Sequence, residues 1–430
     1  MNTNKGNPLA LLPLGIFLVI FVGSGIITGD FYYISILIPA LLAAIVAILQ
    51  NRKKPTFEKV EQFAKGAGHP DIMIMVFIFI LAGAFSSVAN SIGAVDSTVN
   101  LALTYLPENL IIVGVFIIAG FISLSMGTSV GTISALAPIA VGISAETEFS
   151  AALSLAAVVG GAMFGDNLSI ISDTTIAAVR TQKTEMKDKF KTNFFIVLPA
   201  AILTIILLIV LTSGGESSVN PDSFNGLKVI PYIGVLIGAL AGLNVMAVLI
   251  GGILLSGVIG GISGDYSLDA FMTNITSGIN SMSELIFLTI IIGGIVAMIN
   301  QNGGIQFLLH TLTKGIRSKK GAEGSIAGLV ATTNLATANN TIAIITTGQL
   351  AKNVADEYEI DSRKSASLLD IFSCTVQGLI PYGAQLLTAA QIGELSPIEL
   401  LPYSFYPILI AVSGIVAILV GFPRFKKAAA

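Results

Sequence analysis

Long apolar runs separated by short polar connections make up most of this 430-residue chain. A helix needs about 20 mainly apolar residues to cross the roughly 30 Å hydrocarbon core of a bilayer. Such runs predict membrane-spanning helices at 9–27, 32–50, 72–93, 193–213, 283–301 and 401–421, with two shorter spans inside 230–263. The pattern therefore predicts an all-α integral membrane protein.

Four further apolar segments are interrupted near their middle by small and polar residues. The interruptions read SMGTSVGT at 125–132, GDNLSIISD at 165–173, ATANNT at 336–341 and QGLIPYGAQ at 377–385. Irregular backbone at membrane depth leaves N–H and C=O groups unpaired, so it is tolerated only against protein or a water-filled cavity. These segments therefore predict discontinuous helices arranged around such a cavity.

The charged residues predict which side of the membrane each connection faces. All but Lys228 of the 22 Lys and Arg residues lie in six places, namely Lys5, 52–65, 180–191, 314–320, 352–364 and 424–427. The positive-inside rule places these six, and both chain termini, in the cytoplasm. The remaining connections are placed outside, and they carry Asp30, Asp96, Glu108, Glu146, Glu148, Glu216, Asp222, Asp265, Asp269, Glu284, Glu394 and Glu399.

Connecting these two sets of loops in chain order gives about ten crossings and two re-entrant hairpins. The hairpin at 109–144 starts and finishes outside, whereas the hairpin at 324–355 starts and finishes inside. The broken helix at 150–180 crosses inward, and the one at 365–392 crosses outward. Each half thus has the order span, hairpin, broken span, in opposite orientation, which predicts an inverted-topology repeat.

Similarity between the two halves supports this duplication. ILAGAFSSVANSIGA at 80–94 resembles IIGGIVAMINQNGGI at 291–305, and the comparison pairs Gly83 with Gly293. The segments 55–69 and 264–280, which precede the two repeats, are predicted to be interfacial helices. The predicted organisation is scaffold helices in 1–55, a first transport repeat in 56–192, scaffold helices in 193–263, a second transport repeat in 264–421 and a cytoplasmic tail in 422–430.

Composition narrows the class of protein further. The chain is 54% hydrophobic and 11% charged, with a mean hydropathy of +0.87, and a soluble protein needs more polar surface than that. Two histidines and one cysteine exclude a disulfide framework and disfavour a Cys/His metal cluster. The chain has no GxxxxGK[ST] motif for ATP and no Ser/His/Asp grouping, so we expect neither an ATP-driven pump nor an enzyme. We expect membrane lipid as a partner and no nucleic acid.

Three acidic residues lie within predicted membrane segments: Asp166, Asp173 and Asp370. A carboxylate at that depth is costly, and it is normally retained where an ion, proton or substrate passes. Asp166 and Asn167 are expected at the start of the first broken helix's interruption, while Asp173 is expected to cap its second half. Hard oxygen ligands suit Na⁺. The predicted ion- and proton-binding residues are Asp166, Asn167, Ser169, Asp173, Thr174, Thr128 and Ser129.

The second repeat offers amides and hydroxyls at the matching positions but no acid in its breaks. Pro381 and Gly383 explain why the helix is interrupted there. Asp370 has no counterpart in the first repeat, and two readings stay open: hydrogen bonding between helices, or carrying a proton. The predicted substrate-binding residues are Thr337, Asn339, Asn340, Thr341, Gln377, Tyr382, Gln385 and Thr388.

At FGDNLSIISDTTIAA (164–178) and the basic run that follows it, the chain resembles the NhaC family of Na⁺/H⁺ antiporters, within the ion transporter superfamily. It is most similar to a shorter, amino-acid-transporter-like branch. The resemblance covers most of the chain and implies inverted repeats with re-entrant hairpins. It also implies a cation or substrate site at Asp166, Asn167, Ser169, Asp173 and Thr174, and a homodimer.

Three functions follow from this reading. The first is a Na⁺/H⁺ antiporter of the plasma membrane that works by alternating access at a midplane site, with Na⁺ or H⁺ as coupling ion and no cofactor. The second is a Na⁺- or H⁺-coupled carrier of an amino acid or small carboxylate on the same scaffold. The third, a channel, is disfavoured because two opposed broken repeats suit alternating access, whereas a pore does not need them.

Overall fold

The computed structural model describes most of the chain, and every regular element in the described ranges is a helix. This confirms the predicted all-α class. The described ranges are 6–28, 34–51, 54–105, 107–170, 172–213, 223–265, 267–313 and 316–425. Several residues whose side of the membrane was predicted from the sequence lie outside the described ranges, namely Lys5, Asp30, Arg52, Glu216, Asp222, Lys314 and the tail residues 426–430.

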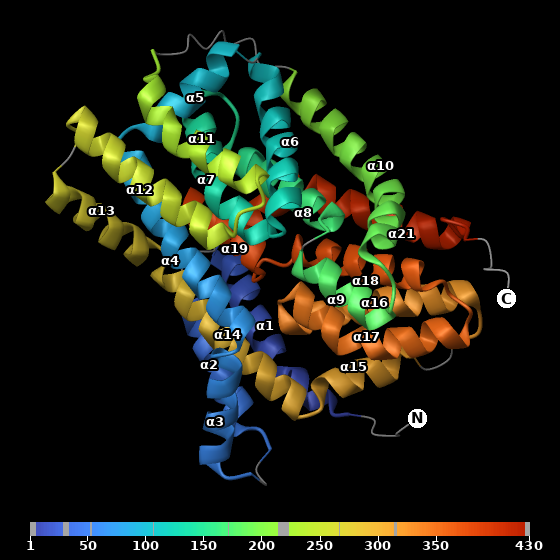
Figure 1. Cartoon of the computed structure of the whole chain (residues 1–430). Helices are drawn as coiled ribbons and strands as arrows, with labels where there is room; N and C mark the ends of the chain where they lie inside the picture. The colour runs from blue at the N-terminus through green and yellow to red at the C-terminus, as the bar shows by residue number, and fades with distance from the viewer. Residues whose placement is uncertain are drawn as a thin grey trace.

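The helices follow the predicted order (Figure 1). The N-terminal scaffold contains η1 (Pro8–Leu11), α1 (Leu12–Thr28) and α2 (Leu37–Leu49). The first repeat contains α3 (Thr56–Ala67), α4 (Pro70–Ser91), α5 (Ala94–Tyr105), α6 (Glu108–Met126), α7 (Ser129–Glu146), α8 (Ala151–Leu168) and α9 (Asp173–Gln182). The connection to the second repeat contains α10 (Met186–Thr212), α11 (Gly226–Leu240) and α12 (Val245–Ser263).

The second repeat begins with α13 (Leu268–Ser281) and ends with α21 (Phe405–Val420). Between them lie α14 (Ser283–Gln301), α15 (Gly304–Thr313), α16 (Lys319–Thr337), α17 (Asn340–Glu357), α18 (Ser362–Gln377), α19 (Ala384–Gly393), α20 (Pro397–Leu400) and η2 (Leu401–Tyr403). Helices α5 and α15 were not predicted, yet they occupy equivalent places in the two repeats, directly after the first span of each. Their agreement strengthens the case for duplication.

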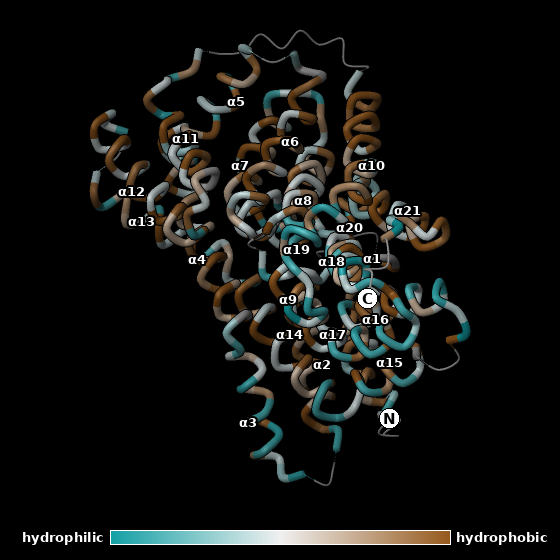
Figure 2. The backbone as a smooth tube through the Cα atoms, turned by 45° about the vertical axis from the view of Figure 1, so that its right-hand side comes forward, coloured by the Kyte–Doolittle hydropathy of each residue, from teal (hydrophilic) through white to brown (hydrophobic). Residues whose placement is uncertain are grey.

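Seven helices in the described part are long and apolar enough to cross a membrane, and the number rises to nine if two bent pairs each count as one span. The pair α5–α6 is bent by 116°, and the pair formed by α20, η2 and α21 by 56°. The structure therefore agrees with a multi-pass membrane protein, while the number of ten crossings stays a prediction. In Figure 2, the backbone of α10 and α21 is largely hydrophobic, as expected for helices that face lipid.

The first short helix of each repeat packs against the first span of the other repeat. Gly66 of α3 meets Gly293 of α14, where a Cβ atom on Gly66 would lie 2.6 Å from the Gly293 carbonyl oxygen. Gly278 of α13 meets Gly83 of α4, where a Cβ on Gly83 would lie 2.2 Å from the Gly278 oxygen. Only glycine allows two helix backbones to approach this closely. The predicted pairing of Gly83 with Gly293 thus marks equivalent crossings in the two repeats.

Both predicted hairpins turn in the same way. Helix α6 ends at Gly127, with a φ of +70°, and α16 ends at Ala338, with a φ of +50°. A residue in this left-handed conformation is a common helix terminator, although Ala338 bears a steric cost that glycine avoids. The next residue, Thr128 or Asn339, then caps α7 or α17 by accepting a hydrogen bond from the backbone N–H three residues further on. The breaks therefore lie where the polar tips were predicted.

Candidate functional site

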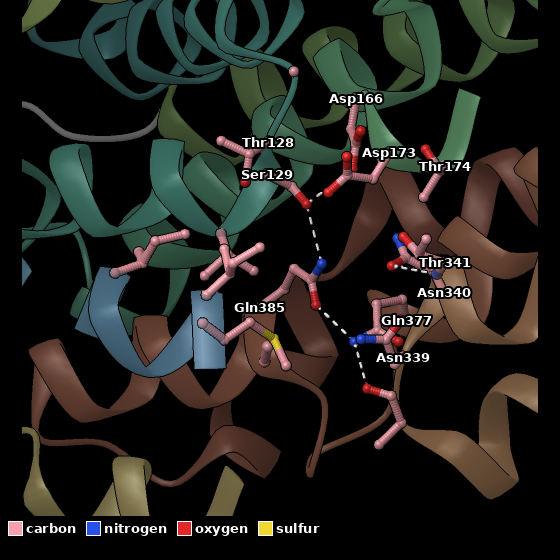
Figure 3. A pocket seen from close by; sticks show the side chains of 17 residues that line it. Thr128, Ser129, Asp166, Asp173, Thr174, Asn339, Asn340, Thr341, Gln377 and Gln385 are labelled. Atoms are coloured by element: carbon pink, nitrogen blue, oxygen red, sulfur yellow. Dashed lines mark hydrogen bonds between the residues drawn. The ribbon is translucent and has the colours of Figure 1, made fainter. Parts of the chain in front are cut away.

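Four helix interruptions come together in the middle of the molecule. A cavity of about 90 Å³ lies between the turn joining α6 to α7, the break between α8 and α9, the turn joining α16 to α17, and the break between α18 and α19. Figure 3 shows polar side chains from all four directed toward it. Ten of the predicted site residues line it: Thr128, Ser129, Asp166, Asp173, Thr174, Asn339, Asn340, Thr341, Gln377 and Gln385.

Asp166 holds the central position on the cavity wall. Its side chain is 4% exposed, and the Ser129 hydroxyl donates a hydrogen bond to its Oδ2 atom at 3.0 Å. The sequence analysis placed Asp166 and Asn167 at the start of the break, but α8 continues through Leu168, so both lie in its last helical turn. The helical register therefore separates these two neighbours: Asp166 lines the cavity, whereas Asn167 is buried behind it.

A chain of hydrogen bonds connects the interruptions to one another (Figure 3). Gln385 Nε2 donates to Ser129 Oγ at 3.0 Å, so the residue that holds Asp166 is itself held by α19. Gln377 Nε2 donates to Gln385 Oε1 at 2.8 Å and to the Ala338 carbonyl at 3.1 Å. Both hairpin tips and both broken helices thus belong to one polar network. A change at one tip has a direct path to the carboxylate.

Asp173 lies on the cavity wall in a different role from the one predicted. The N-cap of α9 is Ser172, whose side chain accepts a hydrogen bond from the Thr175 N–H at 3.2 Å, while Asp173 is the first helical residue. The expectation that Asp173 caps this helix is therefore wrong. As a first-turn acid it is favoured by the helix dipole, and its side chain is exposed to the cavity.

The amides of the second hairpin line the opposite wall of the cavity. Asn339 Oδ1 accepts a hydrogen bond from the Ile342 N–H at 2.9 Å, and Asn340 Oδ1 accepts one from the Thr341 N–H at 3.0 Å. These side-chain oxygens therefore accept hydrogen bonds from backbone N–H groups at the start of α17. The first-repeat wall is acidic and the second-repeat wall is neutral, as the sequence analysis anticipated from the residue types.

Five of the predicted ion- and substrate-binding residues do not line this cavity, and neither does Asp370, the candidate proton carrier. Asn167 and Ser169 are buried, and Ser169 Oγ donates to the Leu124 carbonyl at 3.0 Å. Tyr382 donates to the Leu335 carbonyl at 2.7 Å, and Thr388 donates to the Ala384 carbonyl within its own helix. Thr337 instead lines a separate cavity between α3, α14 and α17. Ser169 thus contacts α6 and Tyr382 contacts α16, whereas the hydrogen bond of Thr388 stays within α19.

Asp370 forms a fully buried ion pair that the sequence analysis missed. The ammonium nitrogen of Lys189 lies 2.8 Å from Asp370 Oδ2, and both side chains are 0% exposed. Lys189 had been assigned to the cytoplasmic stretch 180–191, but its side chain is fully buried in the protein. Lys189 lies in the first turns of α10. One signal was present: Lys189 and Asn193 are four residues apart, so both polar side chains share one face of α10.

A second polar network surrounds this ion pair. Asp370 Oδ2 also accepts hydrogen bonds from Asn193 Nδ2 at 2.6 Å and Asn167 Nδ2 at 3.1 Å. The Tyr406 hydroxyl donates to Asn167 Oδ1 at 2.9 Å. Because Asn167 is joined to Asp166 by a peptide bond, the two networks meet at the end of α8.

The charge of the cavity wall is negative. Two carboxylates, those of Asp166 and Asp173, line it, and among the described residues that do so there is no lysine, arginine or histidine. Lys189 is the basic residue nearest in the network, and its charge is balanced by Asp370. The arrangement can therefore hold a cation between carboxylate, hydroxyl and amide oxygens, or protonate a carboxylate in its place.

Comparison with known proteins identifies relatives of this chain. The model of the family described as "Na+/H+ antiporter family" matches residues 8–212 and 225–423. The chain is 26% identical over 391 residues to Na(+)/H(+) antiporter NhaC of Bacillus subtilis (strain 168), covering 83% of this chain and 84% of that protein. It is 21% identical over 360 residues to the malate-2H(+)/Na(+)-lactate antiporter of the same organism, covering 76% and 77%. The solved YdaH transporter of Alcanivorax borkumensis aligns with a TM-score of 0.43 at 16% identity, covering 85% and 88%.

Proposed function

The chain belongs to the Na⁺/H⁺ antiporter family, and we propose that it exchanges Na⁺ for H⁺ across the plasma membrane at a site centred on Asp166. In this proposal the Asp166 carboxylate holds either one Na⁺ or one proton. The occupied site opens alternately to the two sides of the membrane, as opposed broken repeats permit. Its relatives are transporters, and the chain is a multi-pass membrane protein rather than an enzyme.

The observation that carries the proposal is the charge of the cavity wall. Asp166 is nearly buried, and its described cavity neighbours supply hydroxyls and amides but no positive side chain. A bare carboxylate in such a place is costly, and a bound cation or a proton removes that cost. Mutually exclusive binding of Na⁺ and H⁺ to one carboxylate is the minimal requirement for exchange.

The size of the cavity also favours a small cargo. One water molecule takes up about 30 Å³ of liquid water, so a cavity of about 90 Å³ corresponds to about three waters. That space suits a partly hydrated ion. Ser129 Oγ and Thr128 Oγ1 lie on the same wall as Asp166 and supply further hard oxygens.

A second candidate rests on the amide wall. Asn339, Asn340, Gln377 and Gln385 line the cavity opposite the acids, and amides bind polar organic groups as well as ions. One relative is a malate-2H(+)/Na(+)-lactate antiporter. An amino acid or small carboxylate is therefore the alternative cargo, with Na⁺ or H⁺ as the coupling ion.

Ion flux through the purified protein tests the proposal. Sealed liposomes carrying the protein receive a Na⁺ gradient with no organic solute present, and an internal dye reports pH. We expect Na⁺-driven proton movement in the wild type and none in Asp166→Asn. Asp269→Asn makes the same chemical change at an exposed position of α13 and should leave the flux unchanged.

The outcome separates the two candidates. No proton movement in the wild type, followed by Na⁺- or H⁺-dependent uptake from a labelled panel of amino acids and carboxylates, would replace exchange with organic transport. Full exchange by a well-folded Asp166→Asn protein would show that another group binds the ions.

The orientation and assembly belong to the same proposal. We place both termini in the cytoplasm by the positive-inside rule. Near the C-terminus, five basic residues line one cavity together with three acids: Lys319, Lys320, Arg363, Lys364 and Arg424, with Glu323, Glu359 and Asp361. Lys228, the one basic residue assigned outside, is paired with Asp265, whose Oδ1 atom lies 2.7 Å from its ammonium nitrogen. We keep the division into two transport repeats and scaffold helices, and a homodimer through the scaffold at 9–50 and 193–263, as parts of the proposal.

A further inference from the structure

We propose that the Lys189 ammonium group takes the place of a second bound cation, so that this carrier requires one Na⁺ where an otherwise identical site without the lysine requires two. The first Na⁺ is the one at Asp166, and to that extent the inference rests on the proposed function. The second position lies at Asp370, which is not part of the cavity wall.

The oxygens around the Lys189 ammonium group have the composition of a Na⁺ site. Its nitrogen lies 2.9 Å from the Asn167 carbonyl oxygen, 2.6 Å from Thr175 Oγ1 and 2.8 Å from Asp370 Oδ2. A carbonyl, a hydroxyl and a carboxylate are the hard ligands that alkali cations take in proteins. The three ligands come from α8, α9 and α18, so the ammonium group joins both broken helices.

The local helix geometry also favours a positive charge here. Asn167 lies in the last turn of α8, and its carbonyl group is at the negative end of the helix dipole. Interrupted helices in transporters present such carbonyl groups to Na⁺. Thr175 lies in the first turn of α9, on the other side of the same break.

A fourth oxygen is available and unused. Asp370 Oδ1 is buried and has no hydrogen-bond partner among the residues that the structure describes, although the other carboxylate oxygen, Oδ2, accepts from Lys189, Asn193 and Asn167. A single ammonium group has only three protons, and here all three have oxygen partners. A metal ion does not bind through directed N–H bonds, so a Na⁺ at this position can contact both oxygens of the Asp370 carboxylate.

The charge balance of the buried groups sets the number of cations, and Asp173 is left out of this balance because its side chain is exposed to the cavity. Asp166 and Asp370 contribute two negative charges to the buried networks, and Lys189 contributes one positive charge. The remainder is one negative charge, which one Na⁺ or one proton neutralises. Removal of the Lys189 side chain leaves two negative charges around space that the ammonium group had filled, and two cations are then needed to neutralise them.

Equilibrium binding of ²²Na⁺ to the purified full-length protein tests the inference. We expect one Na⁺ per chain in the wild type, two in Lys189→Ala and one in the double variant Lys189→Ala/Asp370→Asn, which removes both charges of the pair. Lys191→Ala removes an exposed lysine two residues away on α10 and should leave the count at one. A folded Lys189→Ala protein that still binds one Na⁺ overturns the inference.

If the Lys189→Ala protein is too unstable for the binding measurement, thermal melting in NaCl and in choline chloride tests the inference instead. We expect Na⁺ to raise its melting temperature more than that of the wild type, because Na⁺ then occupies the position of the ammonium group. Equal responses to Na⁺ in the two proteins overturn the inference, and so does a Lys189→Ala protein that Na⁺ does not rescue.

The binding counts also distinguish this inference from the proposed function. Zero Na⁺ in the wild type with one in Lys189→Ala would reject Na⁺ binding at Asp166 while supporting the position at Asp370. One Na⁺ in both proteins would support the site at Asp166 and reject the role of Lys189.

Discussion

The Ser129 hydroxyl donates a hydrogen bond to the Asp166 carboxylate across 3.0 Å, and this contact joins the tip of the first hairpin to the end of the first broken helix. Ser129 is the first residue of α7, directly after its cap. Any movement of the hairpin tip therefore changes the surroundings of the buried acid. In the proposed exchange cycle, this contact would couple the ion occupancy of Asp166 to the position of the hairpin.

Loss of this hydroxyl should weaken ion binding without unfolding the protein. A hydrogen bond to a charged group contributes about 1.5–3 kcal/mol, and its loss favours the protonated over the ionised Asp166 side chain. Because H⁺ then competes more strongly with Na⁺, Ser129→Ala should raise the Na⁺ concentration for half-maximal exchange roughly 10- to 100-fold. Na⁺ titration of the flux measures this shift. Thr132→Ala, which removes a hydroxyl bonded to the Thr128 carbonyl within the same helix, is the control. Equal shifts in the two variants would contradict a specific role for Ser129.

Separation of the buried ion pair should destabilise the protein strongly. Removal of one partner of a buried pair typically costs about 3–5 kcal/mol, because the other charge stays buried and unpaired. We expect Lys189→Ala in Na⁺-free buffer to melt well below the wild type. The double variant Lys189→Ala/Asp370→Asn should recover much of the loss, because no charge is then left unpaired. Additive losses in the double variant would mean that the two side chains act independently.

The crossing of α4 with α13 should tolerate no side chain at Gly83. A Cβ atom there would lie 2.2 Å from the Gly278 carbonyl oxygen, so Gly83→Ala forces the two helices apart. Overpacking of this kind costs about 1–3 kcal/mol, which would appear as a lower melting temperature. Gly251→Ala in α12 adds the same methyl group at a position where none of the described residues places an atom within 4 Å. The prediction fails if both variants melt together with the wild type.

The membrane topology can be read by cysteine labelling. Single cysteines at positions 146 and 268 should react with an impermeant reagent from outside the cell, whereas one at 318 should react only after the membrane is opened. Cys374, the chain's own cysteine, is buried and can be replaced to remove any background. Reaction of position 318 in sealed, right-side-out cells would overturn the proposed orientation.

The sequence by itself determined the class of protein, the order of the helices apart from α5 and α15, and the approximate place of each interruption. The length of each apolar run and the positions of Gly, Asn and Pro act locally, and the match of Gly83 with Gly293 can be read by comparing the two halves of the sequence. The helix Ser283–Gln301, for example, was predicted to the residue. The polar tips were equally readable, because glycine, threonine and asparagine around Thr128 and Asn339 combine turn formation with capping.

Only the tertiary structure decided which polar groups face one another. Asp166 and Asn167 are neighbours in sequence, yet the helical register of α8 sends one to the cavity and the other to Tyr406. Lys189 was assigned to a cytoplasmic stretch from its charge alone. The positive-inside rule counts charges, so it cannot detect that Asp370, far along the chain, is the buried partner of Lys189. Pairing across the fold depends on three-dimensional distance, and no local pattern encodes that distance.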